Sequence, residues 1–242
     1  MASIVMERVY YRYRGQAGWA LEDVSLSLPW GRILVAGGTG SGKTTLLRVA
    51  SGAAARIYGG VVRGKITLGG KAVLVPQNFD AFILMPTPRL ELIYVMENIG
   101  FSPKEIDERL QDISESLGIS ALLDRRVATL SAGERQRVAI ASALAMSPDI
   151  LMLDEPLAYV DPQTASKVLD AVASLGVKAV IVAEHRLHIL RRWATHLVYM
   201  EKGRVKYTGP MRKAQDLPLS MAIQLMDPGE AARVAEARGC LG

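Results

Sequence analysis

Apolar residues near the start of the chain follow the patterns of β-strands. Residues 5–13 are rich in β-branched and aromatic side chains, and residues 24–28 alternate strictly between apolar and polar positions. Residues 33–36 are an unbroken apolar run, which is typical of a strand covered on both faces. These three segments predict two partly exposed strands followed by one buried strand.

Glycines mark the next two predicted elements. A glycine-rich turn follows the buried strand, and residues 44–50 then have the composition of a helix. Residues 64–75 contain the pair Gly69-Gly70 inside a second strand region. Such a pair between short strand-forming runs predicts a β-hairpin.

Residues 80–147 predict a mostly helical insertion. Ser102 and Pro103 form a typical helix start, and Glu105 stands at the third helical position, where it can complete a capping box. Apolar residues then recur at helical spacing until Gly118, which ends the pattern; they are Ile106, Leu110, Ile113 and Leu117.

Two further buried strands follow, at residues 150–153 and 177–183, and a helix from about residue 162 to 175 separates them. This strand–helix–strand order predicts an α/β fold: a P-loop core with a mostly parallel sheet, an N-terminal antiparallel β-subdomain and the inserted helices. We expect one domain over residues 1–210 with its helical subdomain at about 80–147. Residues 211–242 are expected to be a C-terminal extension, with a short helix at 230–238.

Composition excludes several classes of protein. The chain has 242 residues, half of them hydrophobic, which is enough for a sizeable core and excludes a disordered protein. Its single cysteine, Cys240, excludes an intrachain disulfide framework and a cysteine-based zinc finger. A net charge of +5 is compatible with an anionic partner, such as nucleic acid, a membrane surface or phosphates, but charge alone favours the alternative of an ordinary basic surface.

Hydropathy predicts no membrane span and no signal peptide. No apolar run approaches the roughly 18–20 residues that cross a bilayer. The first 14 residues are interrupted by Glu7 and by arginines and lack a long apolar stretch. We therefore expect a protein of the cytosol.

The strongest chemical motif is the octapeptide Gly37-Gly38-Thr39-Gly40-Ser41-Gly42-Lys43-Thr44, which matches G-x-x-x-x-G-K-[ST] in full. It follows a buried strand and precedes a helix, as phosphate binding requires. The glycines let backbone N–H groups converge on phosphate oxygens, and the helix N-terminus adds positive potential. Lys43 is expected to reach the β- and γ-phosphates, and the Thr44 hydroxyl to bind Mg²⁺.

Two acids follow the apolar run that begins at Ile150. Ligands in open parallel sheets lie beyond the carboxyl ends of strands, so Asp154 is expected near the phosphates as a Mg²⁺ ligand. Glu155, one residue further, is suited to act as a general base on an attacking water. The alternative is that both acids only terminate the strand.

A second helix start has no phosphate of its own in the chain. Ser131 and Glu134 form a capping box before an apolar helix over residues 138–146. Ala132 and Gly133 leave the tip small, so an anion could approach its N–H groups. The simplest use for this tip is in trans, against the γ-phosphate held by another subunit.

These residues resemble the ABC-type ATPases, whose signature peptide is L-S-G-G-Q. The resemblance covers roughly residues 4–210 and six motifs in the family's order. By this resemblance Gln77 is the Q-loop glutamine, Asp161 the D-loop aspartate and His185 the switch histidine. Tyr13, thirty positions before Lys43, resembles the aromatic residue that stacks on adenine, with Tyr11 as the alternative.

The resemblance implies a complete set of site residues. It assigns catalysis to Glu155, His185 and Gln77, and Mg²⁺ to Thr44, Gln77 and Asp154. ATP contacts fall on Tyr13, the loop from Gly37 to Thr45, and Ser131, Ala132, Gly133, Glu134 and Asp161. Two positions depart from the signature, because Ala132 replaces a glycine and Glu134 replaces the glutamine. Glu134 would disfavour an anion unless its carboxylate points back at the cap.

The resemblance further implies an ATP-hydrolysing subunit of a membrane importer, which binds ATP and Mg²⁺. Its expected partners are a second ATPase subunit, identical or related, and an integral membrane subunit, at the cytoplasmic face of the membrane. Segments 77–80, 102–106, 141–148 and 184–187 look most like the energy-coupling-factor and cobalt-type branch, which imports vitamins or transition-metal ions. Nucleic acid is not expected as a partner.

Other readings stay open from the residues alone. A soluble ABC-type ATPase acting on a protein assembly or nucleic acid is the main alternative, and a P-loop kinase is a third class. Apolar residues 79–85 are either core or a groove for a membrane subunit. His188 and His196 are interpreted as surface or packing residues, and the basic cluster at 185–192 as an exposed helix start.

Overall fold

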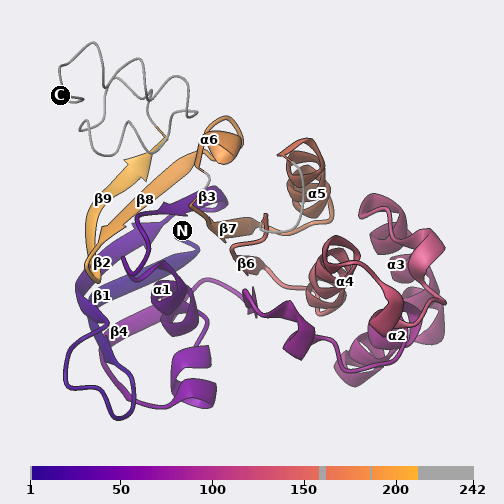
Figure 1. The fold of residues 1–242 in the computed structure, drawn as a ribbon, viewed down its shortest axis with the longest axis horizontal. Coiled ribbons are helices and arrows are strands. Elements are labelled where there is room, and N and C mark those ends of the chain that lie inside the picture. Colours follow the sequence, from indigo (N-terminus) through magenta and orange to yellow (C-terminus); the bar gives the residue numbers. More distant parts are fainter. Residues whose placement is uncertain (1, 158–161, 186, 212–242) are drawn as a thin grey trace. The chain divides into compact units, whose positions relative to one another are not determined.

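The computed structural model describes residues 2–157, 162–185 and 187–211. These described residues divide into two compact units, one within residues 68–182 and the other formed by residues 2–67 together with 183–185 and 187–211 (Figure 1).

The second of these units begins with an antiparallel sheet. Strand β1 (Ile4–Arg12) pairs with β2 (Leu21–Leu28), so that Ile4 lies opposite Leu28 and Tyr11 opposite Leu21. Strand β4 (Val61–Leu68) lies on the other side of β1. Buried and exposed residues alternate along the second half of β2, because one face of this sheet packs on the core and the other meets solvent. The predicted antiparallel β-subdomain is therefore confirmed.

The same unit contains the strand that leads to the phosphate loop. Strand β3 (Gly31–Ala36) is buried over its last four residues and pairs in parallel with β8 (His196–Glu201). β8 pairs antiparallel with β9 (Arg204–Pro210). Helix α1 (Lys43–Ala50) follows the loop directly, a π-helical turn covers Ala54–Tyr58, and the short helix α6 covers Leu187–Leu190.

The unit of residues 68–182 contains buried parallel strands. β5 (Ala72–Val75) pairs in parallel with β6 (Ile150–Asp154), and β7 (Ala179–Ala183) is the next strand in the order. Helix α5 (Pro162–Ser174) links β6 to β7. Every residue of β6 and β7 is buried, as the continuous apolar runs predict.

Three helices form the insertion predicted for residues 80–147. They are α2 (Pro88–Ile99), α3 (Pro103–Ser116) and α4 (Ala132–Ala145), and two 3₁₀ turns, Ser120–Leu122 and Val127–Thr129, lie between α3 and α4. The capping box of Ser102 and Glu105 starts α3, and its apolar stripe is buried as the periodicity predicts. α4 packs against both α2 and α3 and is almost wholly buried from residue 138 on.

The hairpin predicted for residues 64–75 is wrong. β4 belongs to the sheet of β1, whereas β5 pairs with β6. The glycine pair serves a close contact instead of a hairpin turn: a Cβ on Gly70 would lie 2.5 Å from Asp149 Oδ2, and the Lys71 N–H donates to that oxygen at 2.9 Å. The glycine thus lets the chain pass over the carboxylate that precedes β6.

The predicted fold class is confirmed: the protein is α/β, with mostly parallel strands beside a three-stranded antiparallel sheet and a mostly helical segment. Within the described residues, no helix is both long enough and apolar enough to cross a bilayer. The division at residue 210 stays a prediction, since residues 212–242 lie outside the described part, as does the helix expected at 230–238.

Candidate nucleotide site

The phosphate loop lies between β3 and α1 and depends on its glycines. Gly37 has φ +147°, and a Cβ there would collide with the Met200 carbonyl oxygen and lie 2.6 Å from Ser41 Oγ. Gly40 and Gly42 also have positive φ, at +73° and +104°. Positive φ strains any residue with a Cβ, so the loop can take this path only with glycine at these positions.

Lys43 lies inside the curve of the loop. Its side chain is buried, and Nζ donates to the carbonyl oxygens of Gly37, at 2.8 Å, and Gly38, at 3.1 Å. The ammonium group is therefore held beside the loop backbone, where it adds a full positive charge. A lysine so placed serves as a point charge for phosphate oxygens.

The outer surface of the loop is open to an anion. Gly38, Thr39 and Gly40 are exposed, and a Cβ built on Gly38 or Gly40 would meet no atom within 4 Å. Helix α1 begins after Gly42 without a side-chain cap and without an acid in its first turn. No side chain of the first turn therefore offsets the positive end of the helix dipole, and this end suits phosphate.

The turn between β8 and β9 holds the loop in place, a contribution that the sequence interpretation missed. The Gly203 N–H donates to the Ser41 carbonyl at 2.9 Å, and the Ser41 N–H donates to the Gly38 carbonyl at 3.1 Å. Lys202 and Gly203 both have positive φ, as in a two-residue hairpin turn. The Lys-Gly pair between two strand-forming runs was the available signal for this hairpin.

The two tyrosines proposed to stack on adenine have different environments in the structure. Tyr11 is fully buried, its hydroxyl donates to the Gly59 carbonyl at 2.6 Å, and burial raises the pKa of its hydroxyl. Tyr13 is only half-buried, and its hydroxyl lies 3.1 Å from Thr45 Oγ1, on the first turn of α1. An aromatic ring must be accessible to stack on a base, so the geometry favours Tyr13.

Tyr58 and Arg48 extend this aromatic cluster and were not expected. Arg48 Nη1 donates to the Tyr13 hydroxyl at 3.2 Å, and its guanidinium lies 4.1 Å from the centre of the Tyr58 ring. The rings of Tyr13 and Tyr58 meet edge to face at 6.4 Å. Tyr58 is 39% exposed, so it is a second candidate for contact with a nucleotide.

A second group of candidate residues lies at the carboxyl edge of the β5–β6 pair. Val75 is the register partner of Leu153, so Gln77 and Glu155 both follow the strands at the same edge. Gln77 Nε2 donates to Glu155 Oε2 at 2.7 Å, which brings two predicted catalytic residues into direct contact. Asp154, the last residue of β6, is 4% exposed.

Glu155 stands in a strained conformation. Its φ is +51°, in the left-handed region that residues with a Cβ rarely adopt. Such strain is kept where the surrounding structure fixes a side chain for a purpose. Here it turns the Glu155 carboxylate toward Gln77, while the buried Asp154 offers the hard oxygen donors that Mg²⁺ prefers.

The tip of α4 has the predicted capping box. The Glu134 N–H donates to Ser131 Oγ at 3.2 Å, and the Ser131 N–H donates to Glu134 Oε2 at 2.7 Å. Ser131 is exposed, so the tip faces solvent in this chain. The carboxylate of Glu134 points back at the cap, which is the orientation that keeps it from blocking an approaching anion.

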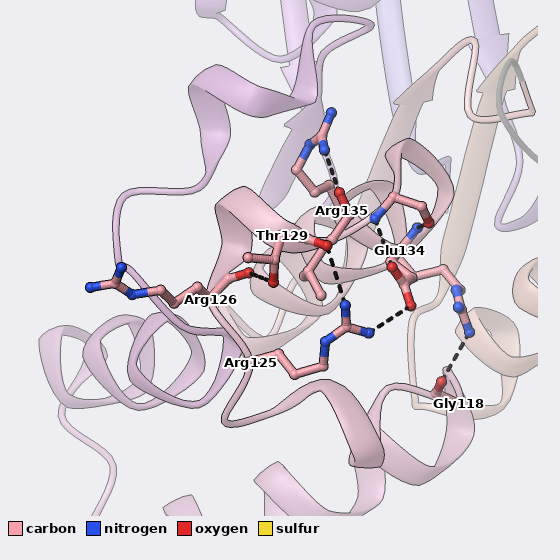
Figure 2. Close-up of polar contacts among 9 residues, drawn as sticks. Gly118, Arg125, Arg126, Thr129, Glu134 and Arg135 are labelled. Carbon is pink, nitrogen blue, oxygen red and sulfur yellow. Dashed lines mark hydrogen bonds and ion pairs between the residues drawn. The ribbon is translucent and has the colours of Figure 1, made fainter.

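A guanidinium completes this arrangement (Figure 2). Arg125 Nη1 lies 3.3 Å from Glu134 Oε1, and Arg125 Nη2 donates to the Thr129 carbonyl at 3.2 Å. The hydrogen bonds from Ser131, and after them the positive charges of Arg125 and Arg137, lower the pKa of Glu134. Glu134 is therefore ionised at neutral pH.

His185 follows directly after a buried acid. Its Nδ1 lies 3.0 Å from Glu184 Oε1, and its backbone N–H donates to the same oxygen at 2.9 Å. Glu184 is fully buried, whereas the His185 side chain is 54% exposed. Glu184 therefore orients an imidazole that stays accessible, a role that the sequence interpretation did not assign.

The remaining candidates have different outcomes. Asp161 and Arg186 lie outside the described residues, as does the side chain of His188. His196 begins β8, and burial lowers the pKa of its imidazole, in keeping with a packing role. Within residues 79–85, Phe79 is buried but Leu84 is 69% exposed, so this stretch is part core and part surface.

These features define the class of P-loop nucleotide-binding α/β proteins. The family model described as ABC transporter matches residues 21–158, more than half of the chain. The chain belongs to this family, and it carries the family's ATP-binding domain. The predicted family resemblance is confirmed.

Curated relatives agree with this assignment. A putative ABC transporter ATP-binding protein of Treponema denticola is 34% identical over 218 residues, which cover 84% of this chain and 44% of that protein. A protein of the same description from Methanosarcina mazei is 32% identical over 228 residues, covering 87% and 39%. The chain thus spans less than half the length of these relatives.

Solved structures share the fold. The cbiO1 protein of Clostridium perfringens, part of the ABC transporter complex cbiONQ, matches with a TM-score of 0.77 and 24% identity over 96% of this chain and 98% of that one. A nucleotide-free ATP-binding cassette from an ABC transporter gives 0.70 and 26% identity over 95% and 97%. A dimeric bacterial ABC transporter cassette gives 0.72 and 23% identity over 86% and 99%.

Proposed function

We propose that this chain is the ATP-hydrolysing subunit of a membrane importer and that two such subunits close around ATP to drive transport. The observation that carries this proposal is the open phosphate loop, with Lys43 inside its curve and an uncapped α1 behind it. Family membership and the Gln77–Glu155 contact support the same activity.

Binding of ATP rests on the loop from Gly37 to Thr45. The exposed N–H groups of the loop and the first turn of α1 hold the phosphate oxygens, and Lys43 neutralises part of their charge. Tyr13 stacks on adenine, with its hydroxyl anchored by Thr45 and Arg48. Mg²⁺, held by the oxygens of Thr44, Gln77 and Asp154, would offset negative charge on the phosphates.

Hydrolysis rests on Glu155. Its carboxylate accepts a proton from water while the water oxygen bonds to the γ-phosphorus and the bridging β–γ bond breaks, which yields ADP and phosphate. Gln77 keeps the carboxylate oriented through its 2.7 Å hydrogen bond. His185, held by Glu184, contacts the γ-phosphate as that charge develops.

Each site is completed by the partner subunit. Ser131, Ala132, Gly133 and Glu134 at the tip of α4 bind the γ-phosphate held by the other chain, and Asp161 communicates across the dimer. The exposed tip supports this role, as does the dimeric bacterial cassette among the structures of the same fold. The second subunit is an identical or a related chain.

The segment after Gln77 is the proposed contact with an integral membrane subunit. Leu84 is exposed there, and Leu90 and Tyr94 on α2 add apolar surface at 48% and 41% exposure. Glu91 ties this segment to α4: its carboxylate accepts from the N–H groups of Leu84, at 2.8 Å, and Met85, at 2.9 Å, and from Ser142 Oγ at 2.8 Å.

Such a link lets movement at the membrane contact reach the helix that begins at Ser131. Asp80 adds a second tie in the same unit, because Arg135 Nε donates to its carboxylate at 2.7 Å. We place the subunit at the cytoplasmic face of the membrane. The likeness to cbiO1 supports the cobalt-type or energy-coupling-factor branch, with a vitamin or a transition-metal ion as the imported substrate.

The direct test is gentle detergent extraction from cells that express a tagged full chain, followed by identification of what purifies with it. A polytopic membrane protein is the expected partner. Recovery of a ribosome, nucleic acid or a soluble assembly instead would favour a soluble ABC-type ATPase. A Leu84→Ser variant should lose the membrane protein, whereas Leu68→Ser, at an exposed position of the β-subdomain, should keep it.

A further inference from the structure

The Arg125–Glu134 pair adds an element that the phosphate-binding residues alone do not explain. Glu134 places a carboxylate in the first turn of α4, the helix end proposed to receive the γ-phosphate of the partner subunit. Its side chain is 22% exposed, so its charge is only partly screened by water. A carboxylate and a phosphate are both negatively charged and repel each other, so an unbalanced carboxylate at this helix end would oppose phosphate binding.

The guanidinium of Arg125 lies where it balances the charge of Glu134. Its guanidinium spans Glu134 Oε1, at 3.3 Å, and the Thr129 carbonyl, at 3.2 Å, so it is fixed at two points (Figure 2). The Arg125 N–H donates to the Leu122 carbonyl at 3.0 Å, which anchors the backbone as well. A guanidinium with fewer free rotamers loses less entropy when it holds a charge partner.

The other capping box of the same unit provides an internal comparison. Ser102 and Glu105 close α3 with the same pair of reciprocal hydrogen bonds. Among the described residues, no ion pair joins Glu105 to an arginine of the loop before α3; the arginine whose charge acts on Glu105 is Arg109, one turn further along the helix itself. A cap can therefore form without such a partner, and the cap of α4 does not need Arg125 merely to exist.

We propose that Arg125 is a positioning residue that acts through Glu134: it neutralises that carboxylate so that the tip of α4 can accept the γ-phosphate of the partner subunit. This inference rests on the proposed function. Four proteins then give three charge states of the Arg125–Glu134 pair. The pair is neutral in the wild type, negative after Arg125→Met, positive after Glu134→Gln, and neutral again in the double variant.

The experiment measures ATP-driven association of the full chain in a Glu155→Gln background, which holds the ATP state. Arg125→Met should weaken association about tenfold, because Glu134 then loses the stronger of the two positive charges that act on it. Glu134→Gln should tighten it, and the double variant should return to within about twofold of the Glu155→Gln parent. Raising the salt concentration should shrink the Arg125→Met deficit.

Arg126→Met is the matched control. It removes the same charge from the next residue, whose side chain points away from Glu134 (Figure 2). Association should then stay within about twofold of the parent. Binding of a fluorescent ATP analogue to the dilute single chain should be unchanged in Arg125→Met and Arg126→Met, because that affinity belongs to the phosphate loop.

Two results would overturn the inference. If the double variant is as weak as Arg125→Met, then Arg125 only supports the loop through Thr129 and charge is irrelevant. If Arg126→Met is as weak as Arg125→Met, then the effect is one of net charge. Absence of ATP-driven association in every variant, with no hydrolysis by the wild type, is a different pattern: it removes the proposed function itself.

Discussion

Helices α1 and α4 both have a small residue at the N-cap position, yet their N-termini are arranged in opposite ways. Gly42 leaves α1 without a side-chain cap and without an acid in the first turn. Ser131 and Glu134 close α4 with two reciprocal hydrogen bonds. No side chain caps the N-terminus of α1, whereas the capping box of the chain itself occupies part of the N-terminus of α4.

This difference separates a helix start that binds an anion by itself from one that needs help. At α1 the positive charge comes from Lys43, held beside the loop carbonyls. At α4 the nearest charge is negative, and Arg125 must offset it. The uncapped helix has a higher affinity for phosphate and a lower local stability. The capped helix has a lower affinity for phosphate and a higher local stability.

The largest effect is expected at the open helix start. Lys43→Ala removes the cation inside the loop and should lower ATP affinity and hydrolysis at least about 100-fold. Binding of a fluorescent ATP analogue and phosphate release measure the two quantities. Lys104→Ala is the control, because that side chain is 87% exposed on α3 and should leave both within about twofold.

The next effect concerns the shape of the loop. Gly37→Ala drives a Cβ into the Met200 carbonyl and keeps a strained φ, so it should cost about 2–4 kcal/mol of stability. Gly38→Ala meets open space and should change stability by less than about 0.5 kcal/mol. Chemical denaturation of both variants checks this, and equal losses would show that the loop is not shaped as described.

A smaller effect distinguishes the two capping boxes. Ser131→Ala and Ser102→Ala each remove the hydroxyl that accepts the cap hydrogen bond, and Ser102→Ala also removes a hydrogen bond to the Glu105 carboxylate, so each should cost about 1 kcal/mol in denaturation. Only Ser131→Ala should also reduce ATP hydrolysis, since only α4 is proposed to meet a phosphate. Equal turnover in the two variants would mean that the tip of α4 has a structural role alone.

The smallest effect is a dependence of stability on pH. Hydrogen bonds to the cap lower the pKa of both Glu134 and Glu105. A lowered pKa in the folded state stabilises the fold above the ordinary glutamate range, and the gain is lost as pH falls through the folded pKa. Glu134→Gln and Glu105→Gln should each flatten the loss of stability on acidification, as denaturation midpoints at acidic and neutral pH would show.

Much of the fold was predictable because strand and helix periods are local properties. The alternation in β2, the apolar runs of β3 and β6 and the cap of α3 each depend on a few neighbouring residues. The failed hairpin at Gly69-Gly70 shows the limit. Position 70 is a glycine because the Asp149 side chain leaves no room there for a Cβ. Asp149 is distant in sequence, so no local pattern could predict this contact.

About as much of the candidate site as of the fold could be predicted from the sequence. The phosphate loop, the acids after β6 and the cap of α4 are contiguous motifs, so the sequence could indicate them. Arg125, Glu184 and Tyr58 were missed because each matters through a contact: with Glu134, with His185 or with Arg48. Their residue types are common at surfaces, and only the folded chain shows their partners.

The central claim is that each ATP is shared between a phosphate loop and the α4 tip of a second subunit. Light scattering of the Glu155→Gln full chain with Mg²⁺ and ATP tests it most directly. The molecular mass should double with ATP and return to that of one chain with ADP, while turnover is lost. A single-chain mass at saturating ATP, with normal hydrolysis by the wild type, would contradict the claim.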